Sequence, residues 1–366
     1  MLKYQVRIFH FIYDHTGNPW VGGGGAVRAI ELYKRIAPRH EVTIISGRYP
    51  GASDHTADGI RFRFVGYSGK NYLLSTFCYA ASAFRFLREN AAQADIIVED
   101  FAPWNPVFSC FASDKTAILH LNHREGAGIL RRWYVLPGLP FYLIEKYYPR
   151  LFKNVIAVSE GTRRKFDVNA IIISNGIDER ALTGPPPEGK EDFLFFAGRL
   201  HIRNKGLDIL LEAMRLLPSE RLVIAGRGPD MEKLKDMQRE LGLQNVEFAG
   251  FVDERKKMEL MRKAKLFILP SRFEGYGIVL LECAAGATPA VVSDIPELGF
   301  AVNAGFAVNF RKGDSIDLAE KISLLGKDKD TARRRQMGEN GLRFAQDNTW
   351  GSVAAEFESY LQKIML

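Results

Sequence analysis

Two glutamates stand eight positions apart in the second half of the chain, on either side of a glycine pair. Glu274 lies in residues 270–277, which read Pro-Ser-Arg-Phe-Glu-Gly-Tyr-Gly, and Glu282 lies about one turn into an apolar helix predicted over residues 278–285. A carboxylate accepts two hydroxyl hydrogen bonds side by side, so one glutamate suits a ribose and the other a hexose. The amides of residues 276–279 would begin the helix, where an anion such as a phosphate is favoured.

Two cations follow an earlier strand of the same half of the chain, predicted over residues 193–197. They are Arg199, in Gly-Arg-Leu, and Lys205, which precedes Gly206. Arginine offers a planar fork of donors and lysine a compact point charge, and both suit the concentrated negative charge of a diphosphate. Taken alone, the pair could equally be solvated surface charge.

A run of four glycines, residues 22–25, lies between a first strand predicted over residues 4–12 and a helix over residues 26–36. Glycines let the backbone approach a phosphate or sugar closely, although a flexible surface turn would have the same composition. The run lacks the Gly-x-Gly-x-x-Gly spacing of dinucleotide sites, which argues against a dehydrogenase.

Two histidines, His120 and His123, follow a strand predicted over residues 116–119. A lone histidine is often only structural, but the carboxyl end of a strand is where α/β proteins bind ligands. Both histidines remain candidates, and we favour His120 because it is nearer the strand end.

The elements that must position these residues alternate between strand and helix in both halves of the chain. This pattern predicts parallel sheets covered by helices on both faces. The further strands predicted are residues 40–46, 60–65, 95–98, 155–158, 221–225, 246–248, 266–269 and 290–293.

A linker composition interrupts this pattern over residues 178–192, which include Pro185-Pro186-Pro187 between Gly184 and Gly189. We therefore place a domain boundary near residue 180. The prediction is an amino-terminal domain over residues 1–180, a second domain over 181–348 and an amphipathic terminal helix over 349–366.

Composition is that of a globular protein, with 46% hydrophobic and 25% charged residues in a chain of 366. No apolar run approaches the roughly 18 residues that span a bilayer. The first residues read as a strand rather than a signal peptide. The three cysteines are odd in number and far apart, which predicts neither disulfides nor a metal cluster and fits a reducing cytoplasm.

The net charge of +7 falls entirely in residues 1–180, which hold 23 Lys and Arg against 16 Asp and Glu. This excess indicates either ordinary solvated surface or an anionic partner such as a lipid surface. Residues 131–134, Arg-Arg-Trp-Tyr, and residues 141–152 interleave basic and aromatic side chains, a composition suited to a membrane interface. The alternative, which we favour here, is a helix packed in the core.

Taken together, these motifs resemble the retaining glycosyltransferases of the GT-B fold, family 4 type (glycosyltransferase group 1). The match includes Arg199, Lys205 and the Glu-x7-Glu spacing of Glu274 and Glu282. Supporting segments occur in the same order along nearly the whole chain: Val158-Ser159-Glu160, Ser174-Asn175-Gly176-Ile177-Asp178, Ala225-Gly226-Arg227-Gly228-Pro229, Gly250-Phe251 and Thr288-Pro289-Ala290-Val291-Val292. One departure is Tyr276 in place of the family's usual phenylalanine.

The resemblance implies two Rossmann-like domains whose parallel sheets face across a cleft, with the terminal helix returning to the first domain. The second domain would bind a UDP- or GDP-linked sugar, and the first a glycan, lipid-linked or small-molecule acceptor. His120, Glu274, Arg199 and Lys205 are the implied catalytic residues. The implied donor-binding residues are Gly23, Gly24, Arg199, Lys205, Gly250, Phe251, Glu274, Gly275, Tyr276, Gly277, Ile278, Val279 and Glu282.

The implied reaction moves a hexose-type sugar by front-face attack with retention, as in polysaccharide biosynthesis. No cofactor or metal ion is expected, and no Asp-x-Asp pair follows a strand. No nucleic-acid partner is expected.

We expect a cytoplasmic protein, with peripheral contact at the inner face of the membrane as a further hypothesis. Two alternatives stay open: a sugar-nucleotide epimerase of the same fold, and a non-catalytic nucleotide-sugar-binding partner protein.

Overall fold

A computed structural model describes residues 5–21, 23–183, 189–327 and 331–365, with the backbone alone at residues 132 and 133. The chain divides into two compact units. Unit 1 comprises Met1–Asn175 and Trp350–Leu366, and unit 2 comprises Gly176–Thr349. The break falls five residues before the predicted boundary, and the proline triplet at residues 185–187 lies outside the described residues.

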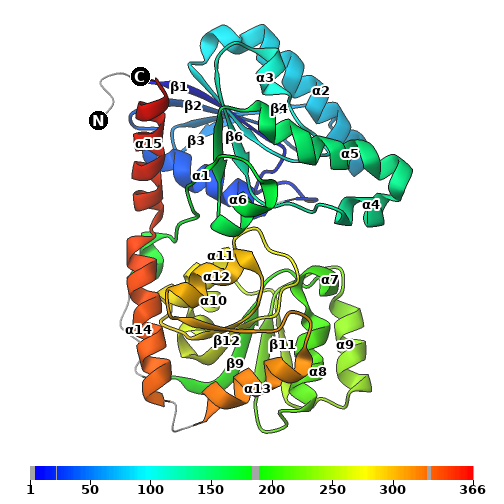
Figure 1. The fold of residues 1–366 in the computed structure, drawn as a ribbon, viewed down its shortest axis with the longest axis vertical. Helices are drawn as coiled ribbons and strands as arrows, with labels where there is room; N and C mark the ends of the chain where they lie inside the picture. The colour runs from blue at the N-terminus through cyan, green and yellow to red at the C-terminus, as the bar shows by residue number, and fades with distance from the viewer. Residues whose placement is uncertain (1–4, 22, 184–188, 328–330, 366) are drawn as a thin grey trace. The chain divides into compact units, whose positions relative to one another are not determined.

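Unit 1 contains a sheet of eight strands among its described residues, in the order β3-β4-β2-β1-β5-β6-β7-β8 (Figure 1). All neighbouring pairs are parallel except β3 and β4, which form an antiparallel pair at one edge. The strands are β1 (Arg7–Ile12), β2 (Glu41–Gly47), β3 (His55–Ala57), β4 (Ile60–Val65), β5 (Ile96–Asp100), β6 (Thr116–Leu121), β7 (Asn154–Ala157) and β8 (Ile171–Ile172).

The helices of unit 1 cover both faces of this sheet. Right-handed connections place helices on opposite faces when the strand order runs in opposite directions from β1. The helices are α1 (Gly24–Ile36), α2 (Tyr72–Asn90), α3 (Ser109–Ala112), α4 (Gly128–Trp133), α5 (Val135–Tyr147), α6 (Glu160–Phe166) and α15 (Trp350–Met365), with 3-10 turns η1 (Ala91–Gln93) and η2 (Tyr148–Leu151).

The last helix, α15, contributes to the core of unit 1 beside α1. Trp350, Val353, Phe357 and Leu361 belong to one buried cluster with residues of α1 and the sheet. The ring of Phe357 lies edge-on to Tyr33, with centroids 6.0 Å apart. Chain ends far apart in sequence therefore share one apolar core.

Unit 2 contains a sheet of six parallel strands among its described residues, in the order β11-β10-β9-β12-β13-β14. This is the doubly wound order, with its reversal between β9 and β12. The strands are β9 (Glu191–Ala197), β10 (Leu222–Ala225), β11 (Val246–Gly250), β12 (Ala264–Leu269), β13 (Ala290–Ser293) and β14 (Ala307–Phe310).

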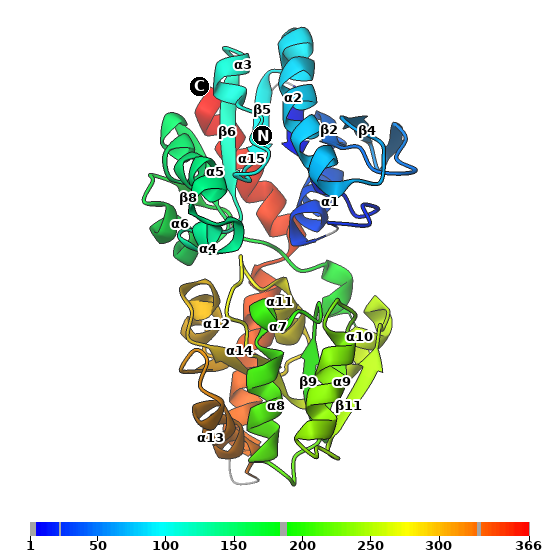
Figure 2. The same ribbon diagram turned by 90° about the vertical axis from the view of Figure 1, so that its right-hand side faces the viewer.

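The helices of unit 2 again divide between the two faces of the sheet, and Figure 2 shows α8 beside α9 in front of the strands. Every helix in the described part of the chain is too short or too polar to cross a bilayer. The helices are α7 (Ile202–Lys205), α8 (Leu207–Arg215), α9 (Met231–Glu240), α10 (Glu254–Lys263), α11 (Ile278–Ala285), α12 (Gly299–Asn303), α13 (Ser315–Gly326) and α14 (Thr331–Asp347), with 3-10 turns η3 (Glu179–Leu182) and η4 (Pro296–Leu298).

The apolar patterns located most elements, and α11 and β4 have the predicted bounds. Three short strands, β3, β8 and β14, were not predicted because each has at most four residues, too few to show a period. Two corrections concern the site. Helix α1 begins at Gly24, inside the glycine run, and β6 continues to Leu121, so His120 lies within a strand rather than after it.

Replacing Phe357 with alanine should lower the free energy of unfolding by about 3–5 kcal/mol, because a buried aromatic ring is lost and a cavity remains. Equilibrium urea denaturation of the full chain measures this change. The control is Met365→Ala on the same helix: Met365 is 45% exposed, so its loss should change stability by less than about 0.5 kcal/mol. Equally small effects for both variants would contradict the docking of α15 in the core.

Candidate active site

Unit 2 brings the two predicted motifs together at the reversal of its strand order. Strands β9 and β12 are parallel neighbours, and each ends at a loop that carries candidate residues. Arg199 and Lys205 follow β9, and Glu274 follows β12. Loops at such a reversal leave from neighbouring strands toward opposite faces of the sheet, which opens the crevice where α/β proteins bind ligands.

Lys205 and Glu274 form an ion pair across this crevice. The side chains are 20% and 10% exposed, respectively. The hydroxyl of Ser271 also donates to Glu274 Oε1, at 2.8 Å. Lys205, the candidate phosphate-binding residue, and Glu274, the candidate sugar-binding residue, therefore lie in direct contact. Both side chains are oriented before any substrate binds.

Backbone hydrogen bonds connect the loops around this pair. The amide of Gly198 donates to Ala225 O at 3.1 Å, and that of Gly226 to Gly250 O at 2.7 Å. The amide of Arg272 donates to Asn204 O at 2.7 Å, which joins the loop after β12 to α7. These bonds restrict how far the loops that carry Lys205 and Glu274 can move.

Gly206 shows how closely two of these loops approach each other. Its φ is +63°, and a Cβ atom there would lie 2.1 Å from the carbonyl oxygen of Pro270. Only glycine fits both the left-handed backbone and this contact. The glycine after Lys205 thus sets the distance between the cation and the loop of Glu274.

Two exposed side chains border the same loops. Arg199 is exposed, and no ion pair of its guanidinium occurs among the described residues. Phe251 is 65% exposed, and the guanidinium of Arg227 lies 4.8 Å from the centre of its ring. The predicted contact at Gly250 and Phe251 is therefore open to a ligand, with a flat ring and a cation beside it.

The loop after β12 leads directly into the amino end of α11. Gly277 precedes the helix with φ +80°, and the first amides of the helix are those of Ile278 and Val279. Amides in the first turn have no carbonyl partner within the helix, so they attract an anion. The ring of Tyr276, by contrast, is buried and stacks on Phe300 at 4.5 Å, so this side chain supports the loop. Gly275 lies between Glu274 and Tyr276, in the same loop.

Glu282 is paired with Lys257, a residue that the sequence did not single out. The two side chains lie 2.9 Å apart, and Lys257 comes from α10. Burial raises the pKa of Glu282, and the positive charge of Lys257 partly offsets this effect. The three partly buried charged candidates, Lys205, Glu274 and Glu282, are thus held in ion pairs.

Unit 1 has a second buried polar cluster, where its own strand order reverses between β1 and β5. His120 Nδ1 and Asp100 form a hydrogen bond, and His10 Nε2 lies 3.3 Å from the same carboxylate. His10 Nδ1 contacts the hydroxyl of Tyr33 at 2.7 Å. The four side chains come from β1, α1, β5 and β6 and fix the orientation of the His120 ring.

The charge state of this cluster follows from its burial and its hydrogen bonds. Burial opposes ionisation of Asp100, but the two histidines outweigh it and hold the pKa of the carboxyl well below its usual range. Burial lowers the pKa of His120, although the neighbouring Asp100 carboxylate acts in the opposite direction, and the net shift favours a neutral ring. A neutral ring that donates through Nδ1 presents Nε2 as an acceptor, and this buried atom has no hydrogen-bond partner among the described residues.

Asp14 connects the glycine run to the end of β1, the strand that also carries His10. The amide of Gly23 donates to Asp14 Oδ2 at 3.0 Å, and Gly24 begins α1 directly after it. Burial raises the pKa of Asp14, while amides that include those of Gly23 and Ala26 act in the opposite direction. The acidic side chain therefore holds the glycine run at the carboxyl end of β1.

The structure separates the two candidate histidines by exposure. His120 is 3% exposed, whereas His123 lies on the surface of the loop after β6. Asp14, Asp100 and Lys257 were not among the residues predicted from the sequence. The two aspartates could have been found, because Asp14 lies two residues after the apolar strand β1 and Asp100 is the last residue of the apolar strand β5. Lys257 could not, because one lysine on a charged helix carries no signal.

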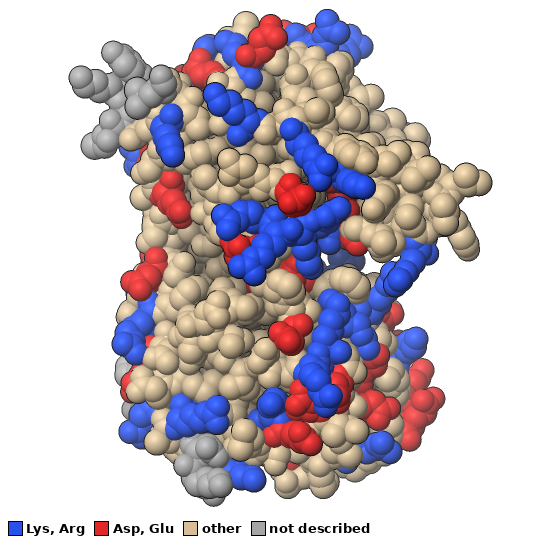
Figure 3. All heavy atoms as spheres, viewed as in Figure 1, with Lys and Arg blue, Asp and Glu red and all other residues tan. Residues whose placement is uncertain are grey.

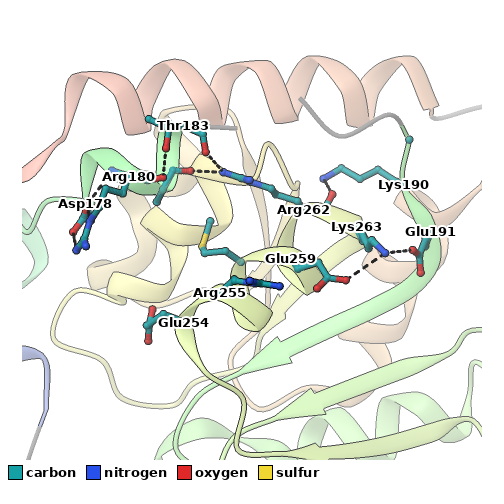
Figure 4. Close-up of a pocket in the computed structure, with 13 residues that line it drawn as sticks. Asp178, Arg180, Thr183, Lys190, Glu191, Glu254, Arg255, Glu259, Arg262 and Lys263 are labelled. Atoms are coloured by element: carbon teal, nitrogen blue, oxygen red, sulfur yellow. Dashed lines mark hydrogen bonds and ion pairs between the residues drawn. The ribbon is translucent and has the colours of Figure 1, made fainter. Parts of the chain in front are cut away.

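The pocket in Figure 4 lies elsewhere in unit 2, near the amino ends of β9 and β12, and has a volume of about 1200 Å³. Its charged residues are largely paired with one another. Arg180 bonds Asp178 at 2.7 Å, and Lys263 bonds Glu191 at 3.1 Å. None of the candidate donor-binding residues lines it, so we do not assign it a ligand.

Comparison with known proteins identifies both halves of the chain. Residues 22–180 match the family described as Glycosyltransferase Family 4, and residues 180–344 match glycosyl transferases group 1. The chain is 28% identical to an uncharacterized glycosyltransferase of Methanocaldococcus jannaschii, over 70% of this chain and 72% of that protein. It is 30% identical to a phosphatidyl-myo-inositol mannosyltransferase of Mycobacterium leprae, over 69% of this chain and 65% of that protein.

Among solved structures, Anabaena HepE in complex with UDP and glucose has a TM-score of 0.75 to this chain. Identity is 18%, and the match covers 98% of this chain and 100% of HepE. At this identity the likeness shows the fold alone, and the prediction of a GT-B fold is confirmed. The chain belongs to the glycosyltransferases, of the family 4 and group 1 type.

Proposed function

We propose that this glycosyltransferase moves a hexose-type sugar from a nucleotide diphosphate sugar to a hydroxyl group of an acceptor, with retention of anomeric configuration. The observation that carries the proposal is the Lys205–Glu274 pair beside the amino end of α11. This arrangement sets a cation and helix amides next to a carboxylate. It suits a molecule that joins a diphosphate to a polyhydroxylated ring.

Each charged group has a distinct proposed role in donor binding. Lys205 and Arg199 contact the diphosphate, together with the amides of Ile278 and Val279. Glu274 accepts hydrogen bonds from hydroxyls of the transferred sugar, and Glu282 accepts them from the ribose. The exposed Phe251 and the backbone at Gly250 contact the base. Lys257 orients Glu282 in the same way that Ser271 orients Glu274.

The proposed reaction is a front-face substitution at the anomeric carbon. The bond from this carbon to the phosphate oxygen breaks, and the bond to the acceptor oxygen forms on the same face. The departing phosphate oxygen takes the proton of the acceptor hydroxyl. Fixed cations and helix amides stabilise the negative charge that develops on the phosphate, and such preorganised electrostatics usually dominates catalysis.

Unit 1 is proposed to serve the acceptor side of the reaction. His120 would accept a hydrogen bond from a sugar hydroxyl through Nε2, near the anomeric centre. Asp100 and His10 act as positioning residues that fix the tautomer and the plane of the ring. Gly23 and Gly24, held by Asp14, allow the backbone to approach the donor closely.

UDP or GDP is the proposed nucleotide, and UDP has the support that the similar HepE structure contains it. A glycan or a lipid-linked molecule is the proposed acceptor, in polysaccharide biosynthesis. The mannosyltransferase relative, whose name specifies a phosphatidyl-inositol acceptor, supports the lipid-linked case. The proposed location is the cytoplasm, with peripheral contact between the basic unit 1 and the inner face of the membrane.

The proposal includes no metal ion. The described residues contain no group of three His, Cys, Asp or Glu side chains that could hold one. Arg199 and Lys205 supply the positive charge that the leaving diphosphate needs.

Replacing Lys205 with alanine should weaken binding of the nucleoside diphosphate about 10- to 100-fold, since a charge-assisted hydrogen bond is worth about 1.5–3 kcal/mol. Calorimetric titration with UDP and GDP, each with EDTA and with magnesium, measures this loss.

Replacing Glu274 with glutamine should keep nucleotide binding but slow sugar transfer by at least about 100-fold, because the proposed contact of Glu274 is with the sugar. Lys321→Ala, a lysine on α13, is the control and should change neither. Equal nucleotide affinity in wild type and Lys205→Ala would overturn the assignment.

Replacing His120 with alanine should slow transfer about 100-fold without changing nucleotide affinity, and Asp100→Asn should slow it about tenfold, because the ring remains but its tautomer is no longer fixed. Release of nucleoside diphosphate from the sugar nucleotide measures the rate, and its pH profile should shift in Asp100→Asn. His123→Ala is the matched control. A loss of activity in His123→Ala with none in His120→Ala would reverse our choice of histidine.

A further inference from the structure

Helix α5 of unit 1 presents an apolar face to solvent instead of packing it in the core. Val135, Leu139, Leu143, Tyr147 and Leu151, which we call the apolar stripe, recur every four residues along α5 and η2. Successive residues at this spacing are neighbours on a helix surface, so the five form a strip that winds gradually around α5 and η2. Their exposed fractions are 64%, 41%, 41%, 49% and 55%. From the sequence we favoured a helix packed in the core here; Tyr148 and Phe152 do join a core cluster, but these five residues do not.

The stripe is exposed although α5 is firmly attached to unit 1 by its other face. Glu145 is buried and accepts the amides of Glu125 and Gly126 at 2.8 and 2.7 Å. Gly138 is also buried, and a Cβ atom there would lie 3.2 Å from Ile129 O. The exposure therefore reflects which face of the helix is used for packing.

Neighbouring apolar residues enlarge this surface. Phe77 on α2 is 49% exposed and stacks on Phe141 of α5, with ring centroids 6.2 Å apart. Leu73 and Leu74, at the start of α2, are also exposed. Figure 3 shows the surface over α4 and α5 as a projection that is almost entirely tan. Soluble monomers rarely expose apolar patches of this kind without a partner.

The segment that carries the stripe has a positive net charge. Residues 126–159 contain five cations, and their single acid is the buried Glu145; the cations are Arg131, Arg132, Lys146, Arg150 and Lys153. Lys146 and Arg150 lie 5.2 and 5.8 Å from the centre of the Tyr147 ring. One of these cations, Arg150, also pairs with the exposed Asp167 at 3.4 Å. Apolar and aromatic side chains flanked mainly by cations are the composition of helices that lie in the headgroup region of a bilayer.

A pocket of about 650 Å³ adjoins the end of the stripe and contains Leu151, Phe152, three lysines and Asp114. The lysines are Lys115, Lys153 and Lys363, and they come from the starts of β6 and β7 and from α15. Lysines gathered from three elements suit a phosphate group. The pocket thus adds positive charge where the apolar stripe ends.

We propose that the apolar stripe and its cationic border form the surface by which unit 1 docks on a bilayer containing anionic phospholipids. The proposed function includes peripheral contact between unit 1 and a membrane, and this inference assigns that contact to particular residues. It rests on the membrane contact and not on the proposed donor site. A second copy of the chain is disfavoured as the occupant, because a symmetric contact would bring the two sets of cations together.

Flotation of the full chain with phosphatidylcholine vesicles, with and without phosphatidylglycerol, tests the proposal. We expect binding only to the anionic vesicles, and weaker binding as salt rises. Leu139→Ser/Leu143→Ser should bind at least about tenfold more weakly, because two leucines no longer enter the bilayer. Arg150→Gln/Lys153→Gln should lose about fivefold per cation at low salt.

The matched control is Leu216→Ser/Leu324→Ser in unit 2, whose leucines are 48% and 44% exposed, and it should bind as wild type does. Circular dichroism and UDP titration without vesicles verify that each variant is folded, and they separate failure here from failure of the proposed donor site. Equal vesicle binding by wild type and the stripe variant would overturn the proposal. So would a dimer, seen by light scattering without lipid, that only the stripe variant abolishes.

Discussion

The reversal of strand order in each parallel sheet is the constraint on which the rest of this structure depends. Parallel strands release their carboxyl ends at one edge, and the reversal sends two neighbouring loops toward opposite faces of the sheet. In unit 2 the loops after β9 and β12 carry Lys205 and Glu274. In unit 1 the strands β1 and β5 bring Asp14 and Asp100 to the corresponding edge. Both groups of polar residues are therefore placed by topology.

The charged side chains at these edges are held before a ligand arrives. Lys205 is paired with Glu274, Lys257 with Glu282, and Asp100 with two histidines. Breaking a buried pair by removing one partner leaves an uncompensated charge, which is costly. A diphosphate sugar could contact the Lys205–Glu274 pair without that cost, since its phosphates meet the cation and its hydroxyls meet the carboxylate. Such preorganisation is what stabilisation of a departing phosphate requires.

Sequence alone could predict the elements whose apolar period is long and the motifs carried by their ends. Helix α11 and the loop of Glu274 belong to this class, because an apolar run and a glycine pair frame them. The sequence could not predict that α5 turns its leucines outward, since an apolar helix has the same composition in the core and on the surface. It also could not show that His120 is buried inside a strand, because the partners that satisfy a buried ring, here Asp100 and, beyond it, His10, come from other strands. These outcomes depend on contacts between segments far apart in the chain.

The most direct test of the central claim is to locate the bound nucleotide by hydrogen exchange of the full chain, with and without UDP. The account predicts slower exchange within unit 2 at residues 198–206, 250–252 and 275–282, which surround the reversal between β9 and β12. Protection confined to residues 178–191 and 254–263, which contain the residues lining the pocket in Figure 4, would contradict it.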